Sequence, residues 1–169
     1  MIMEPKILLA LDGSKNSMRA VAYVGDMIHG CECFHITLFH VNAIPPELIE
    51  HGGPTKPDTG RRLAEELQAK QRKWRAEFRE TVGNEIFNPA KKILKDKGVH
   101  ETLSTIKTKI VIRPHPDVAR ILIAETKAGR YSTLVLGKRG RSMAKDFLLG
   151  GVTCKVIHNI KDCTIWVVE

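Results

Sequence analysis

The stretch KILLALDGSKNSMRAV, residues 6–21, decides the fold, because a short apolar run meets a turn and then a helical pattern. The run from Lys6 to Leu11 is typical of a fully buried strand. Asp12 and Gly13 close it as a turn. Beyond Ser14, which is suited to cap a helix, apolar residues recur at the helical period as far as Gly30. This stretch therefore predicts a strand followed directly by a helix.

The same alternation continues along the chain. Further strands are predicted at residues 33–41, 107–112, 133–136 and 164–168, with helical patterns between them. Asp117 is placed to cap one of these helices, and Gly150 precedes another. Buried strands that alternate with helices predict an α/β fold, a five-stranded parallel sheet with helices on both faces. Ligands of such sheets bind beyond the carboxyl ends of the strands, where Asp12, Val41 and Gly137 are expected.

Residues 43–60 are rich in Pro, Gly, Thr and His, and we expect a loop there. The next segment predicts a charged helix that ends at Gly83. Its apolar stripe is Leu63, Leu67, Trp74, Phe78 and Val82. Asn88 and Pro89 fit the cap and the first residue of a second helix that ends near Gly98. Trp74, Phe78 and the distant Tyr23 are expected to pack structurally and not to stack on a ligand.

Composition limits the class of protein. The 169 residues carry a formal net charge of +8, with 43% hydrophobic and 27% charged residues, which is typical of a folded globular chain that favours anionic partners. No apolar run is long enough for a membrane span, and residues 1–14 do not resemble a signal peptide, so a cytoplasmic location without a membrane partner is expected. Aromatic residues are only 5%, which disfavours nucleic acid as a partner.

The cysteines and histidines show no metal-ligand spacing, and we assign no metal ligand among them. The four cysteines are Cys31, Cys33, Cys154 and Cys163, with no CxxC pair.

A glycine segment follows the predicted strand at 133–136. Gly137 and Gly140 come first, and Gly150 and Gly151 stand where the last helix should begin. Glycine lets phosphate oxygens approach the unpaired N–H groups at a helix N-terminus, so the segment fits a phosphate site. A loop that uses glycine only for turns fits equally well, and the Walker pattern GxxxxGK[ST] is absent.

The chain resembles the universal stress protein family along nearly its whole length. The resemblance lies in ILLALDGSKNSMRAV, ITLFHV, TLVLGKRGRS and the Gly-x2-Gly-x9-Gly spacing of Gly137, Gly140 and Gly150. It implies a five-stranded parallel α/β fold, a homodimer, and for one branch of the family an ATP site at the glycine segment. Gly151 departs from the Ser or Thr usual in ATP binders, which implies weaker binding through the loss of about 1 kcal/mol of hydrogen bonding.

Carried over from the family, the site would hold ATP, or AMP or ADP in its place, with Mg²⁺ bound through the phosphates. Its residues would be Ala10, Leu11, Asp12, Val41, Leu136, Gly137, Gly140, Arg141, Gly150, Gly151, Val152 and Thr153. Arg141 fits a phosphate contact or a solvated surface position equally well. Asp12 fits a ribose or metal-ion role better than a simple turn.

The resemblance implies one universal stress protein domain over residues 1–169, with an enlarged loop and helix insert around 43–98 that could close over the site or serve a protein partner. The expected function is that of a dimeric, ATP-dependent regulatory module of the stress response, paired through the C-terminal strand. No catalytic residue is identified, so any ATP hydrolysis should be slow. Two alternatives stay open: a dimeric interaction protein that binds no nucleotide, and an ATP-using transferase, although the motifs HxGH and SGGxDS are absent.

Overall fold

The computed structural model describes residues 5–31, 34–49, 57–99, 105–140 and 149–169. Its centre is a five-stranded parallel sheet in the order β3-β2-β1-β4-β5. The strands are β1 (Lys6–Ala10), β2 (His35–Ala43), β3 (Thr105–Arg113), β4 (Thr133–Gly137) and β5 (Thr164–Val168). The predicted fold class is confirmed. The strand order reverses between β1 and β4, so the expected crevice lies there.

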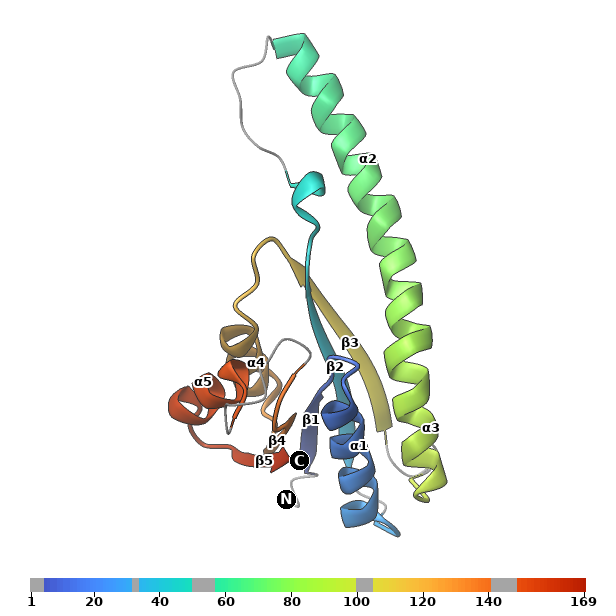
Figure 1. Cartoon of the computed structure of the whole chain (residues 1–169), viewed down its shortest axis with the longest axis vertical. Coiled ribbons are helices and arrows are strands. Elements are labelled where there is room, and N and C mark those ends of the chain that lie inside the picture. Colours follow the sequence, from blue (N-terminus) through green and yellow to red (C-terminus); the bar gives the residue numbers. More distant parts are fainter. Residues whose placement is uncertain (1–4, 32–33, 50–56, 100–104, 141–148) are drawn as a thin grey trace.

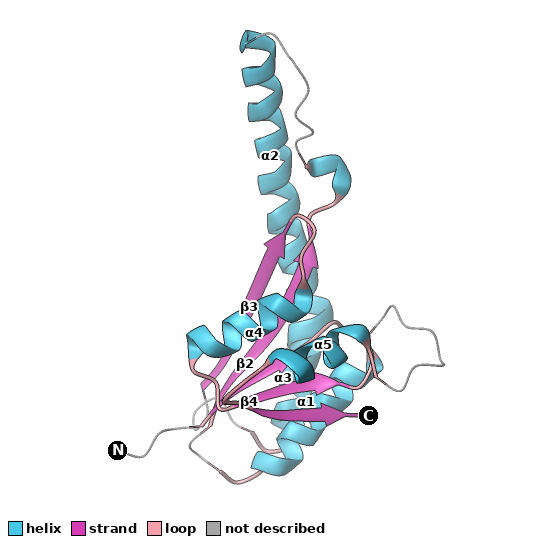
Figure 2. Cartoon of the chain, turned by 90° about the vertical axis from the view of Figure 1, so that its left-hand side faces the viewer, coloured by secondary structure: helices cyan, strands magenta, loops and turns pink. Residues whose placement is uncertain are grey.

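Helices cover both faces of the sheet (Figures 1 and 2). On one face lie α1 (Lys15–Ile28), the end of α2 (Pro57–Val82) and α3 (Asn88–Asp96), and on the other lie α4 (Val118–Gly129) and α5 (Gly151–Asn159). Two apolar clusters fill the space between helices and sheet, one around Leu9, Leu38 and Leu94, the other around Leu8 and Leu134. Alternate residues of one strand thus serve opposite cores.

The predicted helix starts at Ser14 and Asp117 are confirmed. The Ser14 hydroxyl accepts from the Ser17 N–H at 3.1 Å, and an Asp117 carboxylate oxygen accepts from the Arg120 N–H at 3.1 Å. Each side chain satisfies an N–H group that has no partner within its own helix.

The predicted break at Gly83 is wrong, because one continuous helical rod runs from α2 into α3 (Figure 1). A π-helical stretch, Gly83–Phe87, joins them, and the Asn88 N–H donates to the Gly83 carbonyl five residues back. Asn88 is itself helical and caps nothing, and the wide turn lies directly before Pro89, which has no N–H to donate. Buried Val82, Ile86 and Phe87 hold this stretch against the core, which outweighs the glycine.

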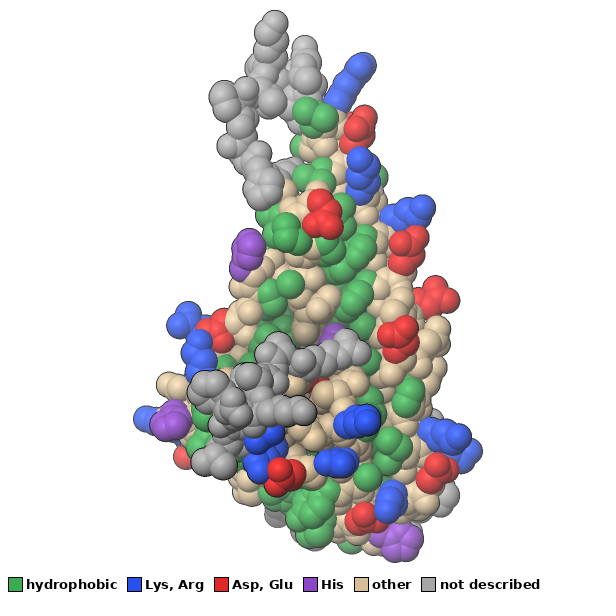
Figure 3. Space-filling model, in the orientation of Figure 1, with side chains coloured by type: hydrophobic (Ala, Val, Ile, Leu, Met, Phe, Trp, Pro, Cys, Tyr) green, Lys and Arg blue, Asp and Glu red, His purple; other side chains and the backbone are tan. Residues whose placement is uncertain are grey.

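The predicted loop over residues 43–60 also needs correction. A short 3₁₀ turn forms at Pro46–Leu48, and α2 already begins at Pro57, because proline fits the first turn of a helix. Twenty-six residues make α2 about 39 Å long, and it extends well beyond the ends of β2 and β3 (Figures 1 and 2). In Figure 3, hydrophobic side chains continue up this face of the molecule, and charged side chains of both signs lie along the outer edge of α2.

No helix in the described part of the chain is both long and apolar enough to pass through a lipid bilayer.

Candidate functional site

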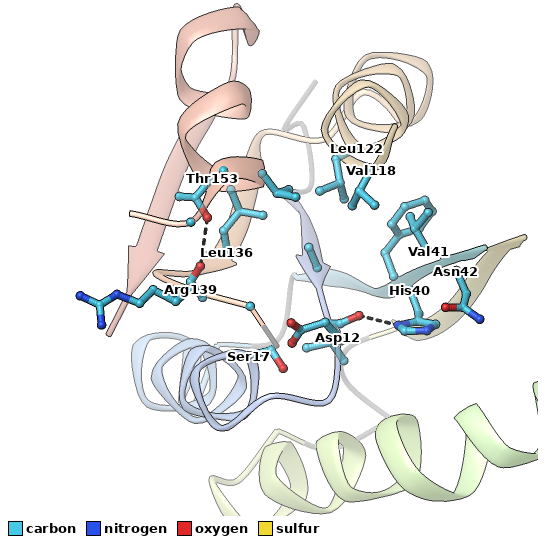
Figure 4. A pocket seen from close by; sticks show the side chains of 18 residues that line it. Asp12, Ser17, His40, Val41, Asn42, Val118, Leu122, Leu136, Arg139 and Thr153 are labelled. Atoms are coloured by element: carbon cyan, nitrogen blue, oxygen red, sulfur yellow. Dashed lines mark hydrogen bonds between the residues drawn. The ribbon is translucent and has the colours of Figure 1, made fainter. Parts of the chain in front are cut away.

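A cavity of about 520 Å³ opens at the carboxyl ends of β1, β2 and β4, at the reversal of strand order (Figure 4). Its size is within the range of small-molecule sites. The residues that line it come from three strands, the starts of three helices and the loops after β1 and β4: Ala10, Leu11, Asp12, Ser17, Phe39, His40, Val41, Asn42, Val118, Leu122, Leu136, Gly137, Arg139, Gly140, Gly150, Gly151, Val152 and Thr153. Eleven of the twelve predicted site residues are among them, and Arg141 lies outside the described residues.

The end of β1 is held by two contacts to β2. The Leu11 N–H donates to the Phe39 carbonyl at 2.8 Å, and the Leu11 carbonyl lies 2.7 Å from Nδ1 of His40. A carbonyl only accepts, so the imidazole donates from Nδ1. His40 is 7% exposed, and its ring also faces Phe78 of α2 at a centroid distance of 6.1 Å. The floor of the cavity is therefore tied to the long helix.

Asp12 has a turn role and a place in the cavity at once. Its Oδ1 accepts from the Ser14 N–H at 2.9 Å, which shapes the turn into α1. The carboxylate also lines the cavity, as Figure 4 shows. The two interpretations offered for Asp12 in the sequence are thus compatible.

One side of the cavity is apolar. Val41 from β2, Val118 and Leu122 from α4 and Leu136 from β4 lie around it in Figure 4. Val118 and Leu122 are one helical turn apart on α4 and so share a face. Such walls suit a flat, weakly polar ring, and the exposed strand ends between them offer backbone N–H and C=O groups to its edge.

The glycines differ in why they must lack a side chain. A Cβ at Gly137 would come 2.9 Å from backbone of Asn16 in α1, so close packing of β4 against α1 requires glycine there. A Cβ at Gly140 would come 2.8 Å from Oδ2 of Asp12. A Cβ at Gly150 would make only ordinary contacts at 3.5 Å, and a Cβ at Gly151 would have no described atom within 4 Å. Backbone packing therefore requires glycine at 137, a movable side chain limits the space at 140, and the contacts of the described residues leave Gly150 and Gly151 unexplained.

The start of α5 faces the cavity with helix N–H groups that have no hydrogen-bond partner among the described residues. Gly150 is the cap and has no side chain to supply, and its own N–H donates to the Lys138 carbonyl at 2.9 Å. The first intrahelical bond is made by Cys154, so the N–H groups of Gly151, Val152 and Thr153 precede it. The Thr153 hydroxyl donates to the Gly137 carbonyl at 3.2 Å and so holds α5 to β4. This helix start is positively polarised and suits an anion.

The two basic residues after β4, Lys138 and Arg139, do not direct their charges into the cavity. Lys138 forms an ion pair with Glu169 at 2.7 Å, and this bond holds the pKa of Glu169 below its usual value. Arg139 lines the cavity, yet its guanidinium points away from it in Figure 4, and its buried Nε has no hydrogen-bond partner among the described residues. No group of histidine, cysteine or carboxylate side chains in the described segments could hold a metal ion.

Sequence reasoning missed seven residues that line the cavity, namely Ser17, Phe39, His40, Asn42, Val118, Leu122 and Arg139. Some signals were present. Val118 and Leu122 follow a correctly predicted cap, and Arg139 lies inside the glycine segment. His40 gave no signal, because its burial and its contact with Leu11 depend on the pairing of β1 with β2.

Comparison with known proteins agrees with this architecture. A protein-family model described as the universal stress protein family matches residues 3–169. No curated protein sequence matches the chain. Among solved structures, hypothetical protein MJ0577 superposes with a TM-score of 0.70 at 21% identity, covering 99% of this chain and 96% of that one.

Two further solved structures share the fold. UspA from Lactobacillus plantarum gives a TM-score of 0.57 at 15% identity and covers 100% of each chain. A universal stress protein solved in complex with cAMP gives 0.56 at 16% identity and covers 98% of this chain and 96% of that one.

Proposed function

Since the chain belongs to the universal stress protein family, we propose that it is an adenine-nucleotide-binding regulatory protein of the stress response, with ATP as its first ligand. One observation carries this proposal: an apolar wall and a free helix N-terminus face each other across one cavity at the reversal of strand order. A purine needs an apolar wall, and a phosphate chain needs N–H donors such as those at a helix start; one cavity offers both. A structural neighbour that holds cAMP supports the choice of adenine nucleotide.

In this proposal the base lies between Val41 and Leu136, beside Val118 and Leu122, where the backbone of β2 presents hydrogen-bonding groups to its edge. The ribose lies near the ends of β1 and β4, within reach of the Asp12 carboxylate, which accepts hydrogen bonds from hydroxyl groups. Ala10 and Leu11 form the floor beneath it.

The phosphates would meet the N–H groups of Gly151, Val152 and Thr153, with Gly140 across from them. No hydroxyl is offered at Gly151, and the Thr153 hydroxyl already serves the Gly137 carbonyl. A magnesium ion would be bound through phosphate oxygens and water, as Mg²⁺ commonly is. We expect binding that is weaker than in a chain with serine at position 151, by up to about tenfold.

We propose regulation and not turnover as the role of the bound nucleotide. Hydrolysis needs a group that orients the attacking water. The Asp12 carboxylate is used at the turn into α1, and the His40 Nδ1 is used by the Leu11 carbonyl. AMP or ADP would keep the base and ribose contacts and lose part of the phosphate contacts.

A second candidate is favoured by one observation, the glycine at position 151. Without the family hydroxyl, the chain could act as a dimeric interaction protein that binds no nucleotide. An ATP-using transferase has no comparable support. Mass spectrometry of any ligand released from the purified protein separates the first two candidates. A copurified adenine nucleotide supports the nucleotide-binding protein, and its absence supports the interaction protein.

We also propose a homodimer paired through β5. This strand is one edge of the sheet, and its exposed residues are Thr164 and Val167, of which Val167 is 37% exposed; Trp166 is in edge contact with the half-exposed Tyr23 at 5.7 Å. The other edge, β3, carries exposed Lys107 and Lys109, which discourage strand pairing. A partner at β5 would cover unpaired backbone and apolar surface together.

A further inference from the structure

The part of α2 that extends beyond the sheet carries an apolar seam. Its members recur at spacings of three and four residues on one side of the helix: Leu63, Leu67, Gln71, Trp74 and Phe78. At its lower end the seam is anchored, because Phe78 packs against the core and stacks on Trp74 at 5.0 Å. In its middle, Gln71 donates to the Leu48 carbonyl.

The described residues do not fully cover the upper end of the seam. Leu63 is 53% exposed, and Leu67 and Trp74 are only half-buried. From Leu63 to Trp74 the helix advances about 16 Å, which is close to three turns. A helix that serves only to cover the sheet has no need of an apolar stripe there, since the strands end below it (Figures 1 and 2).

One flank of this seam is basic and unpaired. Arg72, Arg75 and Arg79 follow each other at three and four residues, so they form one ridge along α2. No carboxylate in the described segments forms an ion pair with any of them. Arg75 is half-buried and stands four residues after Gln71 and three before Phe78, so it is next to the seam.

The acidic residues of α2 do not neutralise that ridge. Glu65 pairs with Arg61 at 3.3 Å, and Glu77 pairs with Lys73 at 3.9 Å. Glu66 and Glu77 stand three residues after Leu63 and Trp74, so they lie along the other flank of the seam, together with Lys70 and Lys73. Only the flank that carries the arginine ridge is therefore positive, and an apolar seam with charged flanks is the arrangement that helices use to select a helical partner.

From this arrangement we infer that the face of α2 from Leu63 to Arg79 is a docking surface for an acidic amphipathic helix of another protein. The partner's apolar residues would lie on Leu63, Leu67 and Trp74, and its flanking Asp or Glu residues would pair with the arginine ridge. A second copy of α2 fits less well, because antiparallel pairing would bring the arginine ridge against itself. Nucleic acid fits less well too, because a phosphate backbone would leave the apolar seam uncovered and because α2 itself carries five acidic residues.

The test uses the full chain and labelled synthetic peptides about three heptads long, with leucine at the seam positions and either glutamate or lysine on the flanks. Fluorescence anisotropy should show binding of the glutamate peptide that weakens as salt is raised, and no comparable binding of the lysine peptide. The double variant Arg75→Glu, Arg79→Glu should lose binding by at least about tenfold.

The matched control is the double variant Arg62→Glu, Lys73→Glu, which makes the same change in charge on another side of the same helix. It should keep binding within about threefold, and circular dichroism should show that both double variants melt like the parent chain. Failure of the glutamate peptide to bind at about 1 mM, equal binding of the lysine peptide, or equal losses in both double variants would each overturn the inference. Tighter binding of a single-stranded oligonucleotide than of the glutamate peptide would overturn it as well. This result is independent of nucleotide binding.

Discussion

The Oδ2 atom of Asp12 lies 2.8 Å from the point that a Cβ on Gly140 would occupy. The end of β1 and the glycine segment are thus in contact across 128 residues of sequence, and the carboxylate is held there by its bond from the Ser14 N–H. This contact closes one side of the cavity.

Gly140→Ala should therefore destabilise the fold, by up to about 1 kcal/mol, because only the end of the Asp12 side chain must move to make room, at the cost of its bond from the Ser14 N–H. Asp12→Ala alone should cost about 1 kcal/mol through the lost bond to Ser14. In the double variant the clash disappears, so the two costs should not add. Denaturant titration of the three variants measures the coupling, and strictly additive costs would show that the two residues do not touch.

Trp74→Ala should lower stability by about 1 to 2 kcal/mol, which is less than the loss of a fully buried ring, because Trp74 is half-buried and stacks mainly on Phe78. Phe78→Ala should cost more, since Phe78 also packs on the core and on His40. Denaturant unfolding of both variants measures which one loses more free energy of unfolding. A Trp74→Ala chain of unchanged stability that has lost its nucleotide would contradict a structural role.

Stability should depend on pH through the pair that joins α4 to α5. The hydrogen bond from Lys155, at 2.7 Å, and the N–H of Arg120 hold the pKa of Asp117 below its ordinary value. A carboxyl whose folded pKa is lowered stabilises the fold above its unfolded pKa of about 4, and loses that contribution as the pH falls through the lowered value.

Asp117→Asn keeps a good helix cap and loses the ion pair. Its free energy of unfolding should be below that of the parent chain at pH 7, and the gap should close as the pH falls below about 4. Thermal unfolding across this range measures the gap. A gap that stays constant with pH would mean that the Lys155 pair contributes nothing.

Pairing through β5 predicts that Val167→Lys separates the dimer, because a charge on an exposed edge strand opposes strand pairing. Thr108→Lys, an equal change in charge on the exposed face of edge strand β3, is the control and should leave the dimer intact. Sedimentation at about 10 μM compares them. A parent chain that sediments as a monomer, or a Val167→Lys chain that sediments with the parent dimer, would contradict this assembly.

The sheet and most of the cavity were predictable because their signals are local. KILLALDG specifies a buried strand and its turn, and Ser14 and Asp117 cap helices where the pattern places them. The helix end predicted at Gly83 was wrong. Burial of Ile86 and Phe87 stabilises the helical conformation beyond this glycine and outweighs its low helix propensity. His40 could not be predicted as part of the cavity, because only the pairing of two strands brings it to Leu11.

Titration of the chain with ATP and magnesium in a calorimeter tests the central claim most directly. The parent chain should bind, and Gly150→Val should not bind. Gly151→Ser should bind up to about tenfold more tightly, because it adds a hydroxyl donor and no described residue lies within 4 Å of a Cβ at that position. A Cβ at Gly150 has only ordinary contacts with the protein, so Gly150→Val should stay folded, and circular dichroism confirms that. GTP should bind more weakly than ATP to each chain that binds. If the parent chain and Gly151→Ser both fail to bind at about 1 mM ATP, or if Gly150→Val binds as well as the parent, the cavity is not a nucleotide site.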